Sequence, residues 1–306
     1  MNRSVGKKKI ENAERNENNM DGILVVDKPK GYTSRDIVNI VSKKLGTKKV
    51  GHTGTLDPLA TGVLVLCIGK ATKFVEILTS TQKEYIAEVC LGTETDTLDI
   101  TGQVLEEADV HLAKNKIIEA LAYYTKTYQQ QVPLYAAVKV NGKKLYEYAR
   151  EGKKIEPPRR EVTITELTLL EDPLYQEGKT YFKMKCTVSK GTYIRSLIRD
   201  IASYLQVPGT MQNLRRIKQG SFLIETAVSL EQIEKGEFSL LPLSSCLTDF
   251  PQIIVDEALE KKIRNGTPLE NKYDTLPILF VNREGKPLAL YQEYTEGKIK
   301  PWKMIG

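Results

Sequence analysis

The chain has 306 residues and a formal net charge of +6, from 45 Lys and Arg residues against 39 Asp and Glu residues. At about 100–200 residues per domain, this length predicts two domains, or one large domain with an appendage. A hydrophobic content of 41% excludes wholesale disorder, and no apolar run approaches the roughly 18 residues of a membrane-spanning helix.

The beginning of the chain is polar and charged, so residues 1–20 are predicted to form a disordered tail. The tail contains no apolar stretch of the kind that a secretory signal requires, and we therefore expect a cytoplasmic protein. Met20 directly precedes the first apolar run and is a second candidate for the natural start of the protein.

The next part of the chain is predicted to fold as short strands and helices separated by polar turns. Thr33 and Asp36 have the spacing of a capping box, and the apolar residues that follow keep a helical spacing until Gly46. A helix is therefore expected between Thr33 and Gly46. We also predict strands over 22–26, 63–68 and 84–91, helices over 71–78 and 112–124, and loops over 51–62 and 93–99.

Strands at 132–140 and 162–169 are predicted on either side of a basic segment. Alternating apolar and polar residues indicate a half-buried strand from Phe182 to Val188, after which the period changes to that of a helix over 194–205. From about Pro251 onward, short strands and turns suit a small β appendage. Because strands and helices mix without regular alternation, the sequence predicts an α+β fold with a mostly antiparallel sheet.

The four cysteines are far apart in the sequence and form no C-x-x-C motif. Buried, reduced thiols are therefore a better explanation than a disulfide framework or a zinc site. The chain has only two histidines, which further weakens the case for a metal centre.

Positive charge is concentrated between Lys139 and Arg160. This window has eight basic and three acidic residues, a balance of +5, and tyrosines at 135, 146 and 148 lie in it or beside it. Basic side chains can hold phosphates and aromatic rings can stack on bases, so an RNA-binding surface is one interpretation. A solvated surface hairpin and helix is the other, and the patch alone slightly favours it.

The most informative segment is GHTGTLDPLATGVLVLCIG, from Gly51 to Gly69. Its polar, glycine-rich first half leads directly into a buried strand, which places Asp57 at the edge of the core. Pro58 removes a backbone donor and stiffens the chain after it. An arbitrary Asp-Pro pair more often caps a turn. The loop lacks the G-x-x-x-x-G-K-[ST] and G-x-G-x-x-G patterns, so nucleotide binding of those kinds is rejected.

The first part of this segment, GHTGTLDPLATGVL, closely resembles the catalytic loop of the bacterial tRNA pseudouridine-55 synthases, the TruB family. Five further segments resemble that family in the same order: DGILVVDKPKGYTS from Asp21, KEYIAEVCLGTETDTLDITG from Lys83, VPLYAAVKVNGKKLYEYAREG from Val132, SKGTYIRSLIRDI from Ser189 and LRRIKQGSF from Leu214. The resemblance covers about Asp21 to Cys246. Beyond it, the C-terminal segment is loosely similar to a PUA-type RNA-binding domain.

The resemblance implies an enzyme that converts a uridine in the T loop of tRNA to pseudouridine. The base is cut from ribose C1′, rotated and rejoined through C5, an isomerisation that requires neither a cofactor nor a metal. Asp57 would be the nucleophile, and Arg195 the cation that pairs with it and favours the charged carboxylate. Tyr85 would stack on the flipped uracil and assist the removal of the proton from C5.

The resemblance also assigns residues that bind the substrate or support the loop. Tyr193 matches a second active-site aromatic residue, and Leu214 matches an apolar wall of the pocket. His52 matches the histidine that helps to hold the target nucleotide out of the stack. The remaining matches are the Lys28–Pro29 pair beneath the catalytic loop and, in the T-arm-binding insertion, Lys143 and Lys144.

We therefore expect the pseudouridine synthase catalytic fold over 21–247, with the basic insertion at about 132–161, and a small β-rich PUA-like domain over 248–306. The expected partner is tRNA, with no membrane contact and, by family precedent, a monomeric enzyme. Three alternatives stay open: an RNA-binding or folding factor that keeps only the scaffold, a pseudouridine synthase for another RNA such as rRNA, and a glycosidase. A glycosidase would need a second carboxylate, which none of the matched motifs supplies.

Overall fold

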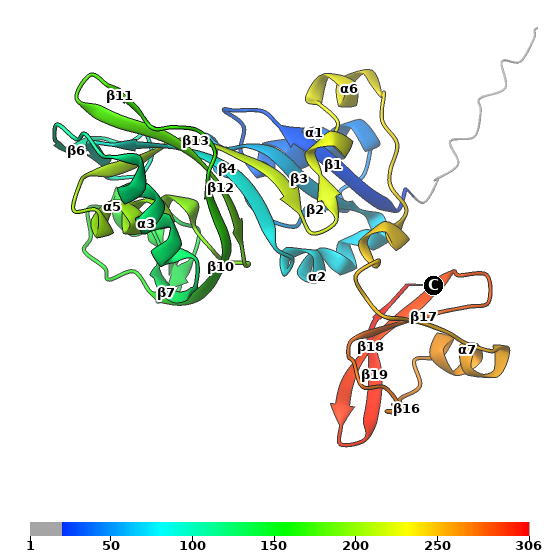
Figure 1. Cartoon of the computed structure of the whole chain (residues 1–306). Coiled ribbons are helices and arrows are strands. Elements are labelled where there is room, and N and C mark those ends of the chain that lie inside the picture. Colours follow the sequence, from blue (N-terminus) through cyan, green and yellow to red (C-terminus); the bar gives the residue numbers. More distant parts are fainter. Residues whose placement is uncertain (1–19, 306) are drawn as a thin grey trace, which may run out of the picture.

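The computed structural model describes residues 20–305, so the predicted tail, apart from Met20, lies outside the described residues. A large sheet extends across the molecule, and a smaller C-terminal sheet lies beside one of its ends (Figure 1). Among these residues, no helix combines the length and apolar character needed to cross a membrane.

The large sheet has ten strands, and its main path follows the order β1-β3-β13-β4-β12-β10-β7. Neighbours on this path are antiparallel except β3 and β13, which run parallel, so the mostly antiparallel α+β prediction is confirmed. The strands are β1 (Gly22–Lys28), β2 (Val50–His52), β3 (Thr61–Ile68), β4 (Lys83–Leu91), β7 (Thr127–Gln131), β10 (Arg159–Leu169), β11 (Leu174–Gln176), β12 (Lys179–Val188), β13 (Gly209–Gln219) and β14 (Phe222–Leu223).

Helices cover the sheet at both ends. Figure 1 shows α1 and α6 near β1, and α3 and α5 at the opposite end, where their apolar residues pack against β10 and β13. The helices of this part are α1 (Ser34–Leu45), α2 (Val75–Thr79), α3 (Lys114–Tyr124), α4 (Leu145–Arg150), α5 (Ile194–Tyr204) and α6 (Leu230–Lys235). Short 3-10 helices are η1 (Gly69–Phe74), η2 (Ile224–Thr226) and η3 (Leu243–Cys246).

The caps of α1 follow the sequence closely. The side chain of Thr33 accepts a hydrogen bond from the backbone N–H of Asp36, and the Asp36 carboxylate accepts one from the backbone N–H of Thr33. The helix ends at Gly46, whose φ of 65° is left-handed and therefore suits glycine. The predicted capping box and helix are confirmed.

The strand predicted over 132–140 is wrong. Only β8 (Lys139–Val140) is a strand there, and the preceding strand, β7, ends before Val132. Pro133 has no backbone donor for a sheet ladder. Val132, Ala136 and Leu145 instead form a small apolar cluster of their own, which accounts for the apolar pattern without a strand.

The acidic stretch expected as a loop over 93–99 contains β5 (Thr93–Thr95), which pairs with β6 (Val104–Glu107). The helix expected over 71–78 is divided between η1 and α2. The four cysteines are buried and free, as predicted.

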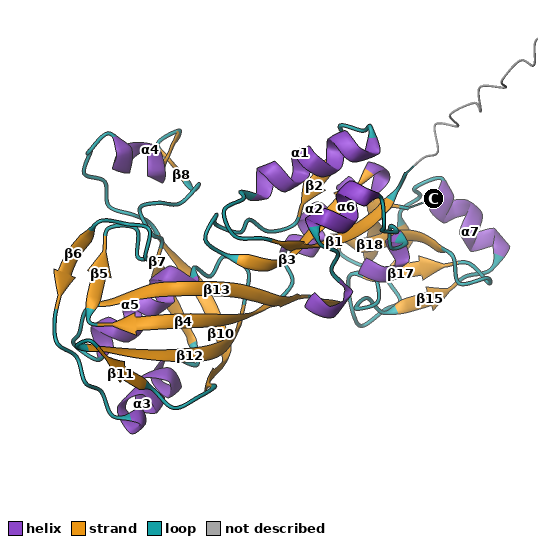
Figure 2. Cartoon of the chain, turned by 90° about the horizontal axis from the view of Figure 1, so that it is seen from above, coloured by secondary structure: helices purple, strands orange, loops and turns teal. Residues whose placement is uncertain are grey.

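The basic segment forms a projection built from β8, β9 (Lys143–Lys144) and α4. Figure 2 shows α4 and β8 standing away from the main sheet. Within the projection, Glu151 forms ion pairs with Lys143 and Lys153. The segment therefore has the form of a surface hairpin followed by a helix.

A C-terminal β-rich domain contains a five-stranded sheet in the order β15-β17-β18-β19-β16. Its elements are β15 (Gln252–Ile254), α7 (Glu257–Arg264), β16 (Leu269–Glu270), β17 (Ile278–Val281), β18 (Pro287–Thr295) and β19 (Lys298–Met304). Short strands were predicted in this region, but α7 was not, because most residues of this short helix are charged.

The C-terminal domain and the large sheet share one apolar cluster. Val25 and Phe74 of the large body are buried in the same cluster as Leu279 and Leu290 of the C-terminal sheet. The two sheets are therefore joined by a common core as well as by the chain that links them.

Candidate active site

Asp57 lies on the loop between β2 and β3, at the edge of the core. The backbone N–H of Leu56 donates to the Ser34 hydroxyl at 2.8 Å, and the N–H of Ala60 donates to the Asp57 carbonyl at 3.0 Å. Leu56 and Ala60 are buried, whereas the Asp57 side chain is 39% exposed. The loop is thus fixed from inside and presents its carboxylate to solvent.

Arg195, the second residue of α5, forms an ion pair with Asp57. Its Nη2 lies 2.8 Å from Asp57 Oδ2, and its side chain is only 5% exposed. The guanidinium also donates to the carbonyl oxygens of Thr97 at 3.0 Å and Tyr135 at 3.1 Å. These contacts hold the cation in one orientation, so the fold brings together the two residues that the sequence motifs predicted as a pair.

Tyr85 lies on β4 directly opposite Arg216 on β13, and both side chains are buried. Arg216 Nη1 donates to the Tyr85 hydroxyl at 3.4 Å, and its Cζ lies 5.9 Å from the centre of the ring. Burial raises the pKa of Tyr85, while the charge and hydrogen bond of Arg216 oppose that rise and the charge of Asp57 adds to it.

His52, on β2, has a buried Nδ1 with no hydrogen-bond partner among residues 20–305. Burial lowers the pKa of His52, and the charges of Arg35 and Arg216 lower it further. Both effects favour the neutral form of the ring. A neutral imidazole with an unpartnered nitrogen can accept a hydrogen bond from a bound polar group or donate one to it.

Lys28 is completely buried at the end of β1. Its ammonium donates to the carbonyl oxygens of Pro29 at 3.0 Å and Tyr32 at 2.7 Å. Burial lowers the pKa of Lys28 to about 8, Arg216 acts in the same direction, and Asp57 opposes both. The turn that Lys28 holds contacts the loop that carries Asp57, because the N–H of Gly31 donates to the Pro58 carbonyl at 2.8 Å.

Tyr193 and Leu214 lie close in the chain to residues of the site. Tyr193 precedes α5, and its backbone N–H donates to the Gln130 side chain at 2.8 Å. Burial raises the pKa of Tyr193, and Arg160, whose Cζ lies 5.6 Å from the ring centre, opposes the rise. Leu214 is buried on β13, two positions before Arg216.

Lys143 and Lys144 lie on the projection, and their polar contacts are with residues of the projection itself. Lys143 pairs with Glu151, and Lys144 Nζ donates to the Tyr146 hydroxyl at 3.4 Å. The fold does not join these two lysines to the contacts around Asp57.

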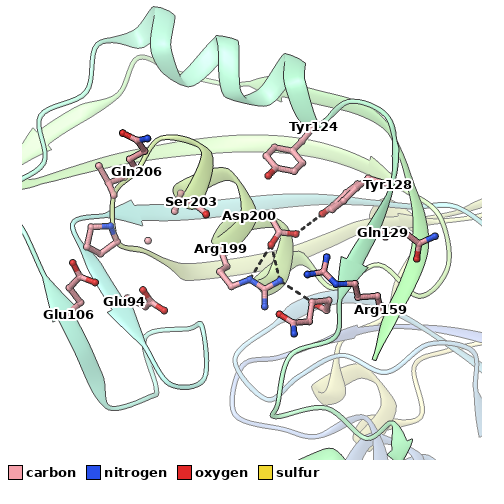
Figure 3. Close-up of a pocket in the computed structure, with 15 residues that line it drawn as sticks. Glu94, Glu106, Tyr124, Tyr128, Gln129, Arg159, Arg199, Asp200, Ser203 and Gln206 are labelled. Carbon is pink, nitrogen blue, oxygen red and sulfur yellow. Dashed lines mark hydrogen bonds and ion pairs between the residues drawn. The ribbon is translucent and has the colours of Figure 1, made fainter. Parts of the chain in front are cut away.

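A cavity of about 570 Å³ lies farther along α5 and contains none of the predicted residues (Figure 3). Arg199, one helical turn after Arg195, contributes to its lining and pairs with Asp200 at 2.8 Å. Tyr128 donates to the same Asp200 carboxylate at 3.0 Å. Arg199 therefore lines this cavity, whereas Arg195 pairs with Asp57, and the cavity is separate from that pair.

The motif resemblance did not assign a role to Arg216, although LRRIKQGSF contains it. Among residues 20–305, it is the one guanidinium that contacts both Tyr85 and the loop that carries Asp57, and its Nη2 donates to the Gly54 carbonyl at 2.9 Å. Side chains alternate along a strand, so Arg216 lies on the same face as Leu214. This alternation is the feature of the sequence that could have indicated a place for Arg216 in the site. Only the register with β4 shows that this face meets Tyr85.

Comparison with protein families gives two adjoining matches. The model for the N-terminal domain of TruB family pseudouridylate synthases matches residues 42–194, and that for the tRNA pseudouridylate synthase B C-terminal domain matches residues 195–240. The tRNA pseudouridine synthase B of a Bacillus cereus strain is 42% identical over 299 residues, covering 94% of this chain and 97% of that protein. The protein of the same name from Clostridium kluyveri is 40% identical, covering 94% of each chain.

Solved structures share the fold at lower identity. A chain in the structure of an H/ACA RNP bound to a substrate RNA containing 2′-deoxyuridine has a TM-score of 0.68 and 22% identity, covering 93% of this chain and 84% of that chain. A chain of a Cbf5-Nop10-Gar1 complex has a TM-score of 0.68 and 23% identity, with coverage of 94% and 84%. The family models and the identity over nearly the whole length agree with the motifs around Asp57, and the chain belongs to the TruB family of pseudouridylate synthases.

Proposed function

We propose that this protein is a tRNA pseudouridine synthase that isomerises the T-loop uridine at tRNA position 55, with Asp57 as its nucleophile. The observation that carries the proposal is the Asp57–Arg195 ion pair, in which a partly exposed carboxylate is held by a buried guanidinium. The tRNA substrate is supported by the curated relatives, which are named for that activity and match over 94% of this chain.

The chemistry assigned to the site conserves atoms and electrons. The N1–C1′ bond of the uridine breaks, the base rotates, and a C5–C1′ bond forms while C5 loses a proton and N1 gains one. Asp57 supplies a carboxylate that can attack an electron-poor carbon or stabilise an oxocarbenium ion. Arg195 orients that carboxylate. Tyr85 offers a ring on which the uracil stacks, and its phenolate form, once its own proton has passed to N1, can receive the C5 proton.

Further residues are proposed to bind the extruded nucleotide. His52 would help to hold the target nucleotide out of the stack, while Tyr193 and Leu214 would enclose the base. Lys28 and Pro29 support the catalytic loop through the turn described above. We propose that the insertion at 132–161, with Lys143 and Lys144, contacts phosphates of the T arm.

The proposed setting is that of a monomeric cytoplasmic enzyme that needs no metal. An isomerisation that balances without redox change or hydrolysis has no step for which a cofactor is required. A role as a tRNA-folding factor can coexist with this activity, since both need the same RNA-binding surface.

The test is tritium release from a tRNA transcript labelled at uridine C5. Wild-type protein should release tritium from the T-loop uridine, and a transcript with cytidine at position 55 should release none. Asp57→Asn should abolish release while changing the tRNA dissociation constant by no more than about threefold, because the nucleophile is lost but the shape is kept. Asp27→Asn is the matched control: Asp27 also pairs with an arginine, Arg215, at 2.7 Å.

Each outcome separates the candidate functions. Release by Asp57→Asn at the wild-type rate would remove Asp57 from its role. Absence of release by the wild-type protein, with tight tRNA binding, would favour the folding factor, and an rRNA transcript would then be assayed for release.

A further inference from the structure

Arg216 is a completely buried cation that has no anionic partner within residues 20–305. Its relative exposure is 0%, and none of the ion pairs in that part of the chain includes it. A buried charge is costly unless hydrogen bonds compensate it. An arginine at such a position calls for an explanation beyond packing, because an apolar side chain of similar volume would avoid that cost.

The hydrogen bonds of Arg216 connect three parts of the site. Nε donates to the carbonyl of Val63 on β3 at 2.6 Å, and Nη2 donates to the carbonyl of Gly54 in the catalytic loop at 2.9 Å. Nη1 donates to the Tyr85 hydroxyl on β4 at 3.4 Å. One rigid guanidinium fork therefore fixes the loop that carries the nucleophile relative to the tyrosine.

A glycine allows Arg216 to come this close. A Cβ atom on Gly62, the second residue of β3, would overlap the backbone of Arg216, and Gly62 has a φ of +99°. A Cβ atom on Gly54 would lie 3.4 Å from Arg216 Nη1. Gly62 is therefore required by the close approach of the β13 backbone at Arg216, whereas Gly54 leaves ordinary contact distance beside the guanidinium.

We propose that Arg216 is a positioning residue of the reaction, which acts by holding the Tyr85 phenol oxygen and the catalytic loop in one fixed arrangement. This inference rests on the proposed function, since it takes Tyr85 as a participant in the chemistry. Arg216 does not need to touch the substrate, because its contacts are with Tyr85 and with backbone carbonyls.

The charge of Arg216 gives the arrangement a second effect. Burial raises the pKa of Tyr85, and the Arg216 charge opposes that rise. A cation beside the phenol oxygen favours its negative form, so it assists a tyrosine that takes up a proton. Loss of the Arg216 charge would raise the pKa of Tyr85 further. The part of the pH–rate profile that depends on Tyr85 ionisation would then move to higher pH.

The test compares Arg216→Lys, which keeps the charge but not the fork, with Arg216→Met, which loses both. Arg215→Met is the matched control, because Arg215 is the neighbouring arginine but pairs with Asp27 at the surface. The measurements are the tRNA dissociation constant, the single-turnover rate constant at saturating enzyme, its pH profile, and the melting temperature.

We expect Arg216→Met to lower the rate constant by about 100-fold and Arg216→Lys by about tenfold, with tRNA affinity within about threefold of wild type. The alkaline shift of the pH profile is expected for Arg216→Met and not for Arg216→Lys. Arg215→Met should keep the rate within about threefold. If Arg216→Met does not fold, the proposal is tested by Arg216→Lys and by the double-mutant cycle described next.

A double-mutant cycle with Tyr85→Phe shows whether Arg216 acts through the hydroxyl. Because Arg216 also holds the loop of Asp57, Arg216→Lys/Tyr85→Phe should be slower than Tyr85→Phe alone, but by about threefold or less rather than the tenfold that Arg216→Lys causes by itself. Multiplicative losses, or Arg216 variants as fast as wild type, would overturn the proposal. An inactive wild-type enzyme would refute the proposed function instead, and the two failures are therefore distinguishable.

Discussion

Within residues 20–305, three buried cationic side chains bond to backbone carbonyls and form no ion pair, unlike Arg195, which pairs with Asp57. Lys28, Lys83 and Arg216 have exposures of 0%, 7% and 0%. Lys83 Nζ donates to the carbonyls of Thr79 at 3.0 Å and Thr81 at 2.8 Å. Each such group lowers the free energy of unfolding while it is charged, because its solvation by water is lost on folding.

The pKa of Lys83 makes this cost measurable. Burial lowers the pKa from its ordinary value of 10.5 to about 8, and the charges of Arg216 and Lys190 contribute. Between these values the unfolded chain binds more protons than the folded protein, so stability should rise with pH across that window. Below about pH 8 both states are protonated and the full cost remains.

We predict that the stability of the wild type relative to Lys83→Met increases between about pH 8 and pH 10 by up to about 1.4 kcal/mol for each pH unit. Urea unfolding of both proteins across the range measures the difference. A difference that stays constant with pH would show that Lys83 keeps its ordinary pKa in the fold.

Tyr85→Phe separates the ring from the hydroxyl. The variant keeps the surface on which a base stacks but loses the acceptor for Arg216. We expect the single-turnover rate to fall by about 100-fold and tRNA affinity to change by no more than about threefold. Tyr291→Phe is the control, since Tyr291 is a buried tyrosine whose hydroxyl donates to the Thr267 carbonyl at 3.0 Å in the other domain. Equal losses of rate and affinity would mean that Tyr85 only packs.

The predicted site residues came from motifs, and the structure supplies the geometry between them. Asp57 and Arg195 were predicted as a pair and lie 2.8 Å apart. Arg216 was not predicted, because an arginine within a strand is ordinarily exposed and its burial depends on the strands placed on either side. That placement is a long-range property, which no local pattern in the sequence contains.

At the scale of elements, the contact between β3 and β13 depends on a glycine. The two strands are parallel here, with Gly62 paired to Arg216. Gly62 has a φ of +99° and leaves no room for a Cβ atom against the Arg216 backbone. Gly46, at the end of α1, also has a positive φ, +65°, but nothing lies within 4 Å of the place a Cβ atom would take.

We predict that Gly62→Ala destabilises the protein by more than about 3 kcal/mol, whereas Gly46→Ala costs about 1 kcal/mol. The first substitution combines backbone strain with a clash between strands, and the second has the strain alone. Urea unfolding measures both. Similar losses for the two variants would show that the strands can separate at Gly62 without penalty.

Elements with local signals were predictable, and elements defined by distant partners were not. The capping box and Gly46 fix α1 within the sequence itself. The apolar residues near Val132 satisfy a strand pattern but pack against Leu145 in a separate cluster. The run of charged and apolar residues in α7 was too short to distinguish from turns, although Asp256 caps it by accepting a hydrogen bond from the Leu259 N–H at 2.8 Å.

At the scale of the molecule, the basic projection stands apart from the main sheet (Figure 2). Replacing Lys143, Lys144, Lys153 and Lys154 by glutamine should weaken tRNA binding. The slope of log affinity against log salt should fall by about 0.7–0.9 for each phosphate contact that is lost. Fluorescence titrations at several salt concentrations provide the slope, with Lys114→Gln/Lys116→Gln on α3 as the control. An unchanged slope would place the projection away from the RNA.

The shared apolar cluster makes the C-terminal domain part of the structural body rather than a tethered addition. Val25 and Phe74 are buried in one apolar cluster with Leu279 and Leu290, so removal of the C-terminal sheet would expose part of that cluster to solvent. The tRNA pseudouridine synthase B of Bacillus cereus aligns with 94% of this chain, so the alignment also includes residues of the C-terminal domain. The two sheets are therefore expected to unfold together.

The central place of β13 has a consequence for synthesis on the ribosome. Its neighbours β3 and β4 are complete by Leu91, but β13 begins at Gly209. At about 5–20 residues per second, roughly 6–24 seconds pass while the nascent chain carries two sheet edges with no strand between them. Arg216 arrives with that strand, so the loop of Asp57 and the ring of Tyr85 acquire their common anchor only when most of the polypeptide has been translated.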